Sequence, residues 1–403
     1  MNQPTLQNRR NDGDILWPLW LSVLGLMVLS AMFIFSTTGG TEVARGVPWY
    51  QWTATRQVIA FGIGIVAVAA MTLVDYSRLA RWSMVGYWMS VALLVAVHLV
   101  GTSRNGARRW LDLGPLQFQP SEVAKLAFLL AMGNFLARPA TELRSSGVFL
   151  RALALTLLPL GLILKQPDLG SSLVFLPVTL VMMVVAGVPG RFITRLLGGA
   201  LLVASLIVAD IMFAPESWRL VRLQEYQRER LLVYFDADFA PRSATPEQRQ
   251  RAAQRKRQMS WNVEQALISV GSGGLTGKGW REGTQHRLGY LPRLGAHNDF
   301  IFSVIAEERG FIGSVAVVTL YGIVLFSGIK TAGEARDRLG RLLAIGVVTL
   351  LFTHIFVNIG MNIKLMPVTG IPLPLLSAGG TSVLCSLIAV GVLQNIHLYR
   401  KRY

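Results

Sequence analysis

The chain has 403 residues, of which 52% are hydrophobic and only 15% are charged, and its formal net charge is +17. Soluble domains carry about 25% charged residues, so this composition excludes an ordinary soluble protein and indicates an integral membrane protein. In a soluble protein the excess of Lys and Arg would suggest a nucleic-acid partner. In a membrane protein much of it follows from basic cytoplasmic loops, so we expect membrane lipids, and no nucleic acid, among the partners.

Stretches of about 20 apolar residues, the length that crosses a bilayer, recur along the whole chain. We therefore predict an all-α integral membrane protein in which residues 1–403 form a single polytopic domain. The first stretch follows Arg9-Arg10, yet its length fits a transmembrane helix better than a secretory signal peptide. About ten transmembrane helices are expected, near residues 16–36, 57–74, 83–101, 121–136, 147–165, 170–188, 195–213, 300–328, 342–364 and 381–397.

Basic residues predict how these helices are oriented. Short segments with several Arg or Lys residues occur at every second connection between the helices, that is, all on one side. The positive-inside rule predicts that this side is the cytoplasm. Both termini are then cytoplasmic and the number of helices is even. The long segment 214–299, between the seventh and eighth helices, becomes one large extracytoplasmic loop, and long loops are exempt from the rule. The cytoplasmic segments contain Arg9-Arg10, Arg78 and Arg81, Arg138 and Arg144, Arg191 and Arg195, Lys330 to Arg341, and Arg400 to Arg402.

The extracytoplasmic loop contains three kinds of sequence. Residues 219–238 alternate charged and apolar residues at helical spacing, which suggests an interfacial helix. Residues 242–258 are polar and basic without apolar periodicity, and we expect a solvated insertion or one that lies on anionic headgroups. A short helix from Trp261 is expected to end at glycines, where Gly271-Ser-Gly-Gly favours a turn over a phosphate-binding nest. The single cysteine, Cys385, lies in the last apolar stretch, so no disulfide within the chain holds this loop.

Three arginines occur between the third and fourth helices, on the outer side, where the positive-inside rule disfavours them. They are Arg104, Arg108 and Arg109, and Trp110 follows them. A planar guanidinium group binds phosphate oxygens in a bidentate way, so a pyrophosphate or a lipid headgroup is a natural partner. Snorkelling to headgroups is the alternative for any one of these residues, but it is less expected for three beside a tryptophan.

Three further ionisable residues lie at helix ends on the same side. Glu122 and Lys125 are three residues apart on one helical face, which suits either a structural ion pair or a substrate contact. Asp168 either caps the helix that follows it or lines the same outer cavity and orients a basic residue.

Asp299, at the start of the eighth helix, is the candidate general base. A basic, glycine-rich loop that begins at Gly277 precedes it, and Glu307, Glu308 and Arg309 follow it within the apolar run. Acids in the membrane are costly, and partial desolvation raises the basicity of a carboxylate. Asp299 is therefore suited to deprotonate a hydroxyl group. The alternative is an ordinary helix cap.

Residues 358–382 contain several prolines and glycines within an apolar stretch, which excludes a regular helix. Irregular backbone at membrane depth persists where it is buried in protein or lines a cavity, so we predict that this segment forms a cavity wall. The five histidines are scattered and no spacing typical of metal ligands occurs, so no resident metal is expected.

Several motifs point together to one family. They are Gly106-Ala-Arg-Arg-Trp-Leu with Gln119-Pro-Ser-Glu-Val-Ala-Lys, Gln166-Pro-Asp-Leu-Gly, Gly273-Gly-Leu-Thr-Gly-Lys-Gly, Asn298-Asp-Phe-Ile-Phe-Ser-Val-Ile-Ala-Glu-Glu-Arg-Gly-Phe, and Pro367-Val-Thr-Gly-Ile-Pro-Leu-Pro-Leu-Leu-Ser-Ala-Gly-Gly-Thr-Ser. Over nearly its whole length the chain resembles the SEDS proteins (shape, elongation, division, sporulation). The second and the last of these motifs are more similar to the elongation branch, RodA, than to the division branch, FtsW.

The resemblance implies a peptidoglycan glycosyltransferase in the bacterial inner (cytoplasmic) membrane, with its active site facing the periplasm. It further implies lipid II as substrate and a class B penicillin-binding protein, a transpeptidase, as partner. The essential acid of the family falls on Asp299. The expected substrate-binding residues are Arg108, Arg109, Glu122, Lys125, Asp168, Lys278 and Ser377.

Three features depart from the family pattern. Two extra residues separate Pro292 from Asp299, and Arg293 stands where the family has Glu. Ser377-Ala-Gly-Gly replaces Ser-Tyr-Gly-Gly, and the tract at 242–258 is atypical.

From the resemblance we expect Asp299 to deprotonate the 4-hydroxyl of the acceptor sugar, which attacks the anomeric carbon of the lipid-linked donor and releases undecaprenyl pyrophosphate. Arg108, Arg109 and Lys125 would hold the pyrophosphate charge, and participation of a divalent cation, Mg²⁺ or Mn²⁺, is left open. The alternatives are a lipid II flippase or transporter, a division-branch polymerase, and a scaffold that only recruits the transpeptidase. A transporter needs a midplane site reachable from both faces, which the outer placement of the polar residues disfavours.

Overall fold

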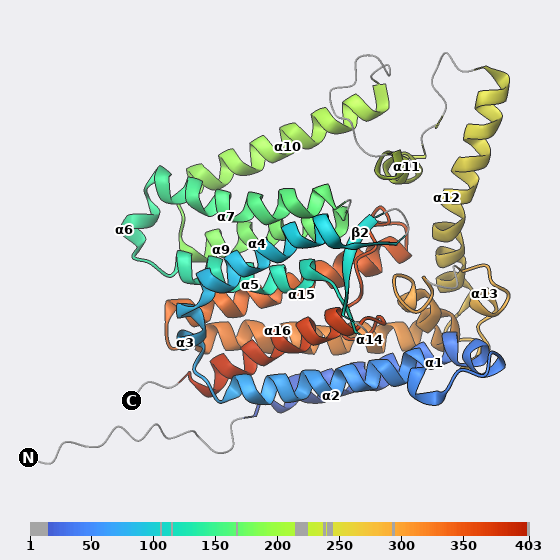
Figure 1. Cartoon of the computed structure of the whole chain (residues 1–403), viewed down its shortest axis with the longest axis horizontal. Helices are drawn as coiled ribbons and strands as arrows, with labels where there is room; N and C mark the ends of the chain where they lie inside the picture. The colour runs from blue at the N-terminus through green and yellow to red at the C-terminus, as the bar shows by residue number, and fades with distance from the viewer. Residues whose placement is uncertain are drawn as a thin grey trace, which may run out of the picture.

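The computed structural model describes residues 15–104, 107–113, 116–166, 168–213, 225–236, 239, 245–291 and 295–400. The chain is mostly helical, as expected (Figure 1). Its helices are α1 (Trp17–Ala44), η1 (Trp49–Gln51), α2 (Thr53–Thr72), α3 (Tyr76–Arg81), α4 (Ser83–Val100), α5 (Pro120–Leu136), α6 (Ala140–Leu143), α7 (Ser146–Lys165), α8 (Leu169–Leu173), α9 (Phe175–Ala186), α10 (Gly190–Phe213), α11 (Glu225–Tyr234), α12 (Pro246–Ser272), α13 (Thr284–Arg287), α14 (Ile301–Glu334), α15 (Arg338–Asn362) and α16 (Gly380–Leu398).

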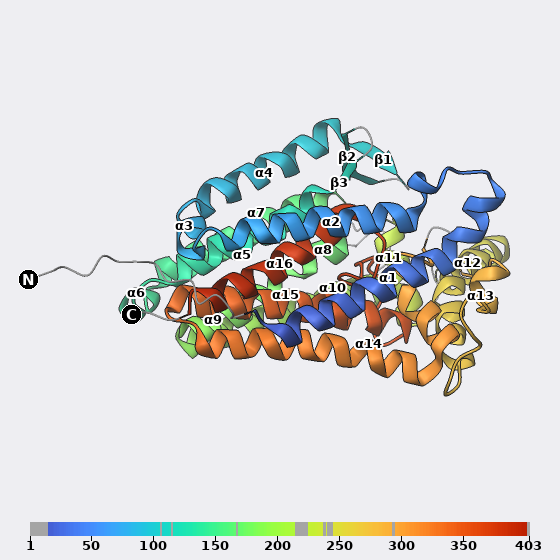
Figure 2. The same cartoon turned by 90° about the horizontal axis from the view of Figure 1, so that it is seen from below.

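Among the described residues, nine helices are long and apolar enough to cross a membrane, with α8 and α9 counted as one. α5 has 17 residues and lies among them in the bundle (Figure 2). The start of α1 and the end of α16 lie at the same end of the bundle, because Gln394 Oε1 accepts hydrogen bonds from the Leu16 amide (3.1 Å) and the Trp20 indole (3.0 Å). α12 and α13 lie at the opposite end.

The expectation of an all-α chain needs one correction. A small antiparallel sheet of order β1-β2-β3 connects α4 to α5, formed by β1 (Thr102–Arg104), β2 (Ala107–Leu113) and β3 (Leu116–Phe118). Thr102 pairs with Trp110, and Leu111 pairs with Phe118. Arg109 belongs to β2.

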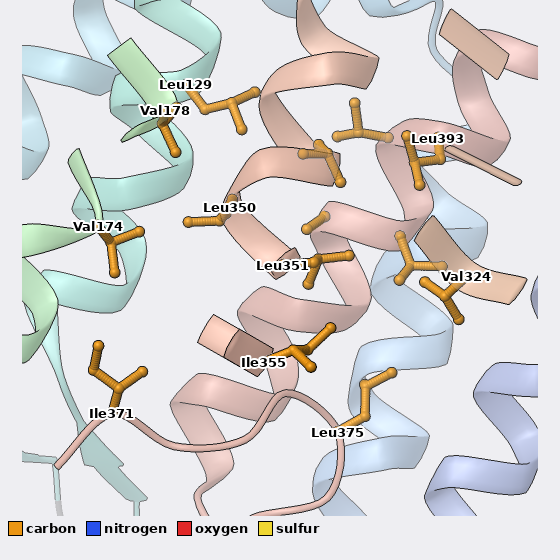
Figure 3. Close-up of a cluster of buried hydrophobic side chains, with 14 of the residues drawn as sticks. Leu129, Val174, Val178, Val324, Leu350, Leu351, Ile355, Ile371, Leu375 and Leu393 are labelled. Carbon is orange, nitrogen blue, oxygen red and sulfur yellow. The ribbon is translucent and has the colours of Figure 1, made fainter. Parts of the chain in front are cut away.

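α15 and α16 form the centre of the bundle. Their apolar segments are 72% and 83% buried, against 11% for α10 at the edge. A helix that is apolar on all sides is stable only when protein or lipid surrounds it, and here other helices surround these two. Figure 3 shows side chains of α5, α9, α14, α15 and α16 meeting in this core, and its labelled residues are Leu129, Val174, Val178, Val324, Leu350, Leu351, Ile355, Ile371, Leu375 and Leu393.

The described part of the segment 214–299 differs from the prediction in the length of one helix. α12 begins at Pro246, within the polar tract at 242–258, and continues to Ser272, so the tract and the short helix expected from Trp261 are one helix. A capping box between Thr245 and Gln248 starts it. After Pro246 and Glu247, its first turns consist of Gln, Arg, Ala and Lys, which form helices without an apolar face, and periodicity alone therefore missed them.

α12 crosses this end of the bundle, opposite the start of α1, at a steep angle to the long apolar helices (Figure 1). Two ion pairs join it to α11 and the residues after it, Arg255–Glu229 at 2.7 Å and Lys256–Asp236 at 2.9 Å. The helix expected over 219–238 corresponds to α11, while residues 219–224, 237 and 238 lie outside the described residues.

A glycine-rich turn docks on a break in α14. α14 departs from helical geometry at Gly310, and the backbone of residues 274–279 supplies hydrogen bonds on both sides of the break. Lys278 N–H donates to Glu307 O (3.0 Å), and Phe311 N–H donates to Gly274 O (2.8 Å). The turn expected at the glycine cluster is present, and the glycines also allow two backbones to approach each other closely.

Candidate functional site

Asp299 lies in the turn directly before α14, at the end of the bundle where α12 and α13 lie. Its carbonyl oxygen accepts hydrogen bonds from the side-chain amides of Asn358 and Asn362, each at 3.1 Å. Both asparagines are fully buried on α15 and are four residues apart, so they lie on one face of that helix. The backbone of the candidate base is thus held from the centre of the bundle.

The Asp299 carboxyl group lies in a charged and partly buried environment. Burial raises the pKa of Asp299 above its usual value, the cations Arg230 and Arg109 act in the opposite direction, and Asp168 adds to the increase. A carboxylate with a raised pKa is a stronger base for a hydroxyl proton. The four residues come from the turn before α14, from α11, from β2 and from the turn before α8, so the fold brings together segments that are far apart in sequence.

Gly370 lies against the carboxyl group. A Cβ atom there would be 3.7 Å from Asp299 Oδ2, and its φ of +76° suits glycine. Arg230 reaches the same segment, because its Nη1 donates to Val368 O at 3.0 Å. The irregular stretch predicted as a cavity wall therefore lies beside Asp299.

Asp168 caps α8, which is one of the two interpretations that its sequence allowed. Its Oδ1 accepts from the Ser171 amide at 3.1 Å and caps α8, while Oδ2 accepts from Gln119 Nε2 at 3.3 Å. The residue is 5% exposed and still close enough to influence the charge of Asp299.

The predicted arginines are only partly described. Arg109 Nε donates to Gln166 O at 3.1 Å, which joins β2 to the end of α7. Arg108 belongs to β2, but its side chain lies outside the described residues, as does that of Arg104. Of the expected basic cluster, the structure therefore places Arg109 near Asp299.

Ser377 supports the Asp299 turn from behind. Its hydroxyl donates to Asn298 O at 2.6 Å and accepts from the Leu373 amide at 2.8 Å, and the residue is 2% exposed. Both of these hydrogen bonds involve the Ser377 hydroxyl group. One of them holds the backbone of Asn298, directly before the candidate base.

Glu122 and Lys125 form a buried ion pair of 2.7 Å in α5. Lys125 Nζ also lies 3.0 Å from Nε2 of His354 on α15. The three side chains line a small pocket between α5, α15 and α16, which Leu350, Pro374 and Cys385 also border. The lysine therefore directs its amine into the bundle.

Lys278 belongs to a second cluster. Its Nζ lies 2.6 Å from Glu307 Oε1 and 2.8 Å from Thr284 Oγ1. Glu307 also accepts hydrogen bonds from the amides of Thr284 (2.8 Å) and Gln285 (3.1 Å). Next to it, Glu308 accepts a hydrogen bond of 2.5 Å from Ser36 of α1. This cluster fastens residues 278–285 to α14, which explains the acids that the sequence places inside an apolar run.

Sequence reasoning missed Asn358, Asn362, His354, Arg230 and Gly370. The two asparagines carry a recognisable signal, since amides spaced by four in an apolar helix need partners. A lone histidine or an arginine in an amphipathic helix carries no such signal. Within the described part of the chain, no group of three or more His, Cys, Asp or Glu residues is arranged to hold a metal ion.

Comparison with known proteins identifies the family. The family model of FtsW, RodA and SpoVE cell cycle proteins matches residues 17–402. The peptidoglycan glycosyltransferase MrdB of Escherichia coli K12 is 34% identical over 383 residues, which cover 94% of this chain and 93% of that protein.

Solved structures agree with this match. The rod shape determining protein RodA of Thermus thermophilus is 28% identical, with a TM-score of 0.67, over 98% of this chain and 100% of that one. A structure described as a peptidoglycan synthase complex that coordinates polymerization and crosslinking is 30% identical, with a TM-score of 0.75, over 96% and 98% of the two chains. The chain belongs to the FtsW/RodA/SpoVE family, and its resemblance to the RodA branch is confirmed.

Proposed function

We propose that this chain is a peptidoglycan glycosyltransferase that polymerises lipid II for cell elongation at the outer face of the bacterial inner membrane. The observation that carries the proposal is the Asp299 carboxyl group, which is half-buried, close to Arg109 and Arg230, and held through its backbone by two buried asparagines. The names of relatives such as MrdB of Escherichia coli support the same activity.

In the proposed reaction, Asp299 removes the proton from the 4-hydroxyl of the acceptor sugar. The hydroxyl oxygen forms a bond with the anomeric carbon of the donor while the bond from that carbon to the pyrophosphate oxygen breaks. Undecaprenyl pyrophosphate leaves with the electron pair, and direct displacement inverts the anomeric centre. Arg109 and Arg230, with Arg108 as a further candidate, balance the negative charge that develops on the leaving group.

Orientation follows from the ends of the bundle. Because α1 starts and α16 ends at one end, the number of crossings between them is even, and α5 added to the nine longer helices makes ten. Arg336 and Arg400 lie at that end, paired with Asp75 before α3 and with Glu334 of α14, so the positive-inside rule supports a cytoplasmic location for this end and for both termini. Asp299 would then face the periplasm.

We further propose a class B penicillin-binding protein as partner. The support is the similar structure described as a synthase complex that coordinates polymerization with crosslinking. In such a complex the polymerase supplies the glycan strands on which the transpeptidase acts.

The test is glycan-chain formation from purified lipid II by the detergent-solubilised protein, alone and with the transpeptidase. Asp299→Asn should yield no polymer, while Asp236→Asn, a matched change at an exposed aspartate paired with Lys256, should match the wild type. Polymer from Asp299→Asn would exclude the general base. No polymer from the wild type, together with transfer of lipid II across a vesicle membrane, would favour the flippase.

A further inference from the structure

Three polar residues form a stripe along one face of α15, at His354, Asn358 and Asn362. Their spacing of four residues places them in line on an apolar helix, over about 12 Å. All three are at least nine-tenths buried. Asn358 and Asn362 bind the backbone of Asp299, and His354 lies at the other end of the stripe, next to Lys125.

Hydrogen-bonding roles define the state of the His354 ring. The amine of Lys125 donates hydrogen bonds and cannot accept them while it is charged. His354 Nε2, at 3.0 Å from that amine, is therefore an acceptor without a hydrogen atom. The ring hydrogen then lies on Nδ1, which faces Pro372 O at 3.4 Å. A neutral imidazole thus connects a charged lysine with a backbone carbonyl group.

Pro372 belongs to the segment beside Asp299. Ile371 O accepts a hydrogen bond of 2.8 Å from Asn358, and Gly370 lies against the Asp299 carboxyl group. Asn358 and His354 of the α15 stripe therefore bind two consecutive carbonyl groups, those of Ile371 and Pro372. The buried ion pair in α5 orients His354.

We propose that His354 is a positioning residue for the transferase reaction. Its ring connects the buried Glu122–Lys125 pair to the segment that lies against Asp299. The inference rests on the proposed function. It gives Lys125 a role that differs from direct pyrophosphate binding: the lysine orders the wall of the site through His354.

The test compares two substitutions of His354 in the full-length protein with lipid II as substrate. Gln offers an acceptor to Lys125 and a donor to Pro372, so His354→Gln should keep kcat within about threefold of the wild type. Leu offers neither, so His354→Leu should lower kcat at least about tenfold because the site is misplaced, with KM changed less than about twofold. Phe352→Leu, at an exposed position of the same helix, is the control.

A double-substitution cycle separates coupling from general damage. Since Lys125 acts through His354, the variant Lys125→Met/His354→Leu should be no slower than His354→Leu alone. Losses that multiply, a His354→Leu variant as fast as the wild type, or equal losses in the Gln and Leu variants together with earlier thermal unfolding would each overturn the proposal.

The same experiment separates this inference from the function beneath it. A normal rate for His354→Leu beside an inactive Asp299→Asn overturns only the role of His354. A wild-type protein that makes no polymer overturns the transferase assignment, and the positioning role with it.

Discussion

The side-chain amide of Asn358 donates to two carbonyl groups, that of Asp299 at 3.1 Å and that of Ile371 at 2.8 Å. One buried residue of the central helix α15 thereby joins the turn that carries the candidate base to the irregular segment that lies against it. The turn that carries the candidate base precedes α14 in the sequence, yet its position depends on α15.

Replacing Asn358 by Ala should lower both stability and turnover. Two buried carbonyl groups would lose their donor, at a cost of about 1–3 kcal/mol, and the Asp299 turn would lose a support. Asn395→Ala is the matched control, because Asn395 also donates to two carbonyl groups, Met71 O and Val74 O, at the opposite end of the bundle. We expect it to lower the free energy of unfolding similarly but to leave kcat per folded molecule unchanged, and equal kcat values for both variants would contradict the prediction.

The raised pKa of Asp299 predicts a cost in stability. In the folded protein the carboxyl group holds its proton more tightly than in the unfolded chain, so its contribution to stability falls as the pH rises through the folded pKa. Asp299→Asn should therefore raise the Tm at neutral pH, and the gain should shrink as the pH falls toward the ordinary pKa of an aspartate. Thermal unfolding at several pH values measures this. Asp236→Asn should show no gain, since Lys256 lowers the pKa of Asp236.

The charges around Asp299 predict shifts of opposite sign in the acid limb of the rate–pH profile. Arg230 lowers the pKa of Asp299, so Arg230→Gln should move the acid limb to higher pH. Asp168 raises that pKa, so Asp168→Asn should move it to lower pH while keeping a side-chain oxygen to cap α8. The measurement is kcat/KM for lipid II across the acid range. Shifts in the same direction would show that another group controls the limb.

Gly277→Ala should disrupt the docking of the glycine-rich turn on α14. A Cβ atom at this position would lie 2.2 Å from Glu308 O, and the φ of +84° is strained for alanine. We expect loss of about 1–3 kcal/mol of folding free energy, measured by chemical unfolding. Gly271→Ala is the control, because a Cβ atom there would meet no other atom within 4 Å and the residue is in α12, where alanine favours the helix.

Lys278→Met distinguishes a substrate contact from a structural one. The amine lies 2.6 Å from the fully buried Glu307, so its removal should leave that carboxylate with fewer donors and lower the Tm, while KM for lipid II stays unchanged. The second change Glu307→Gln should recover part of the stability. Lys330→Met, at an exposed pair with Glu334, serves as control and should have little effect. A raised KM with an unchanged Tm would return Lys278 to the substrate-binding residues.

Several features of the site followed from the chain alone. Asp299 was singled out because an acidic residue at the start of an apolar helix is costly in a membrane. The Glu122–Lys125 pair was predicted because residues three apart share a helical face. Asp168 was recognised as a cap from its place before a helix. Each of these inferences depends on residues that are close in sequence, where local geometry limits the possibilities.

The sequence by itself determined the class of protein, the approximate positions of the apolar helices, and the family, because hydrophobic length and local motifs are properties of neighbouring residues. Tertiary structure alone decided that Lys278 pairs with Glu307, that Ser377 supports the Asp299 turn, and that His354 meets Lys125. Those contacts join segments 29, 79 and 229 residues apart. Their geometry depends on how α14, α15 and α16 pack around one core. This packing cannot be inferred from a pattern of neighbouring residues.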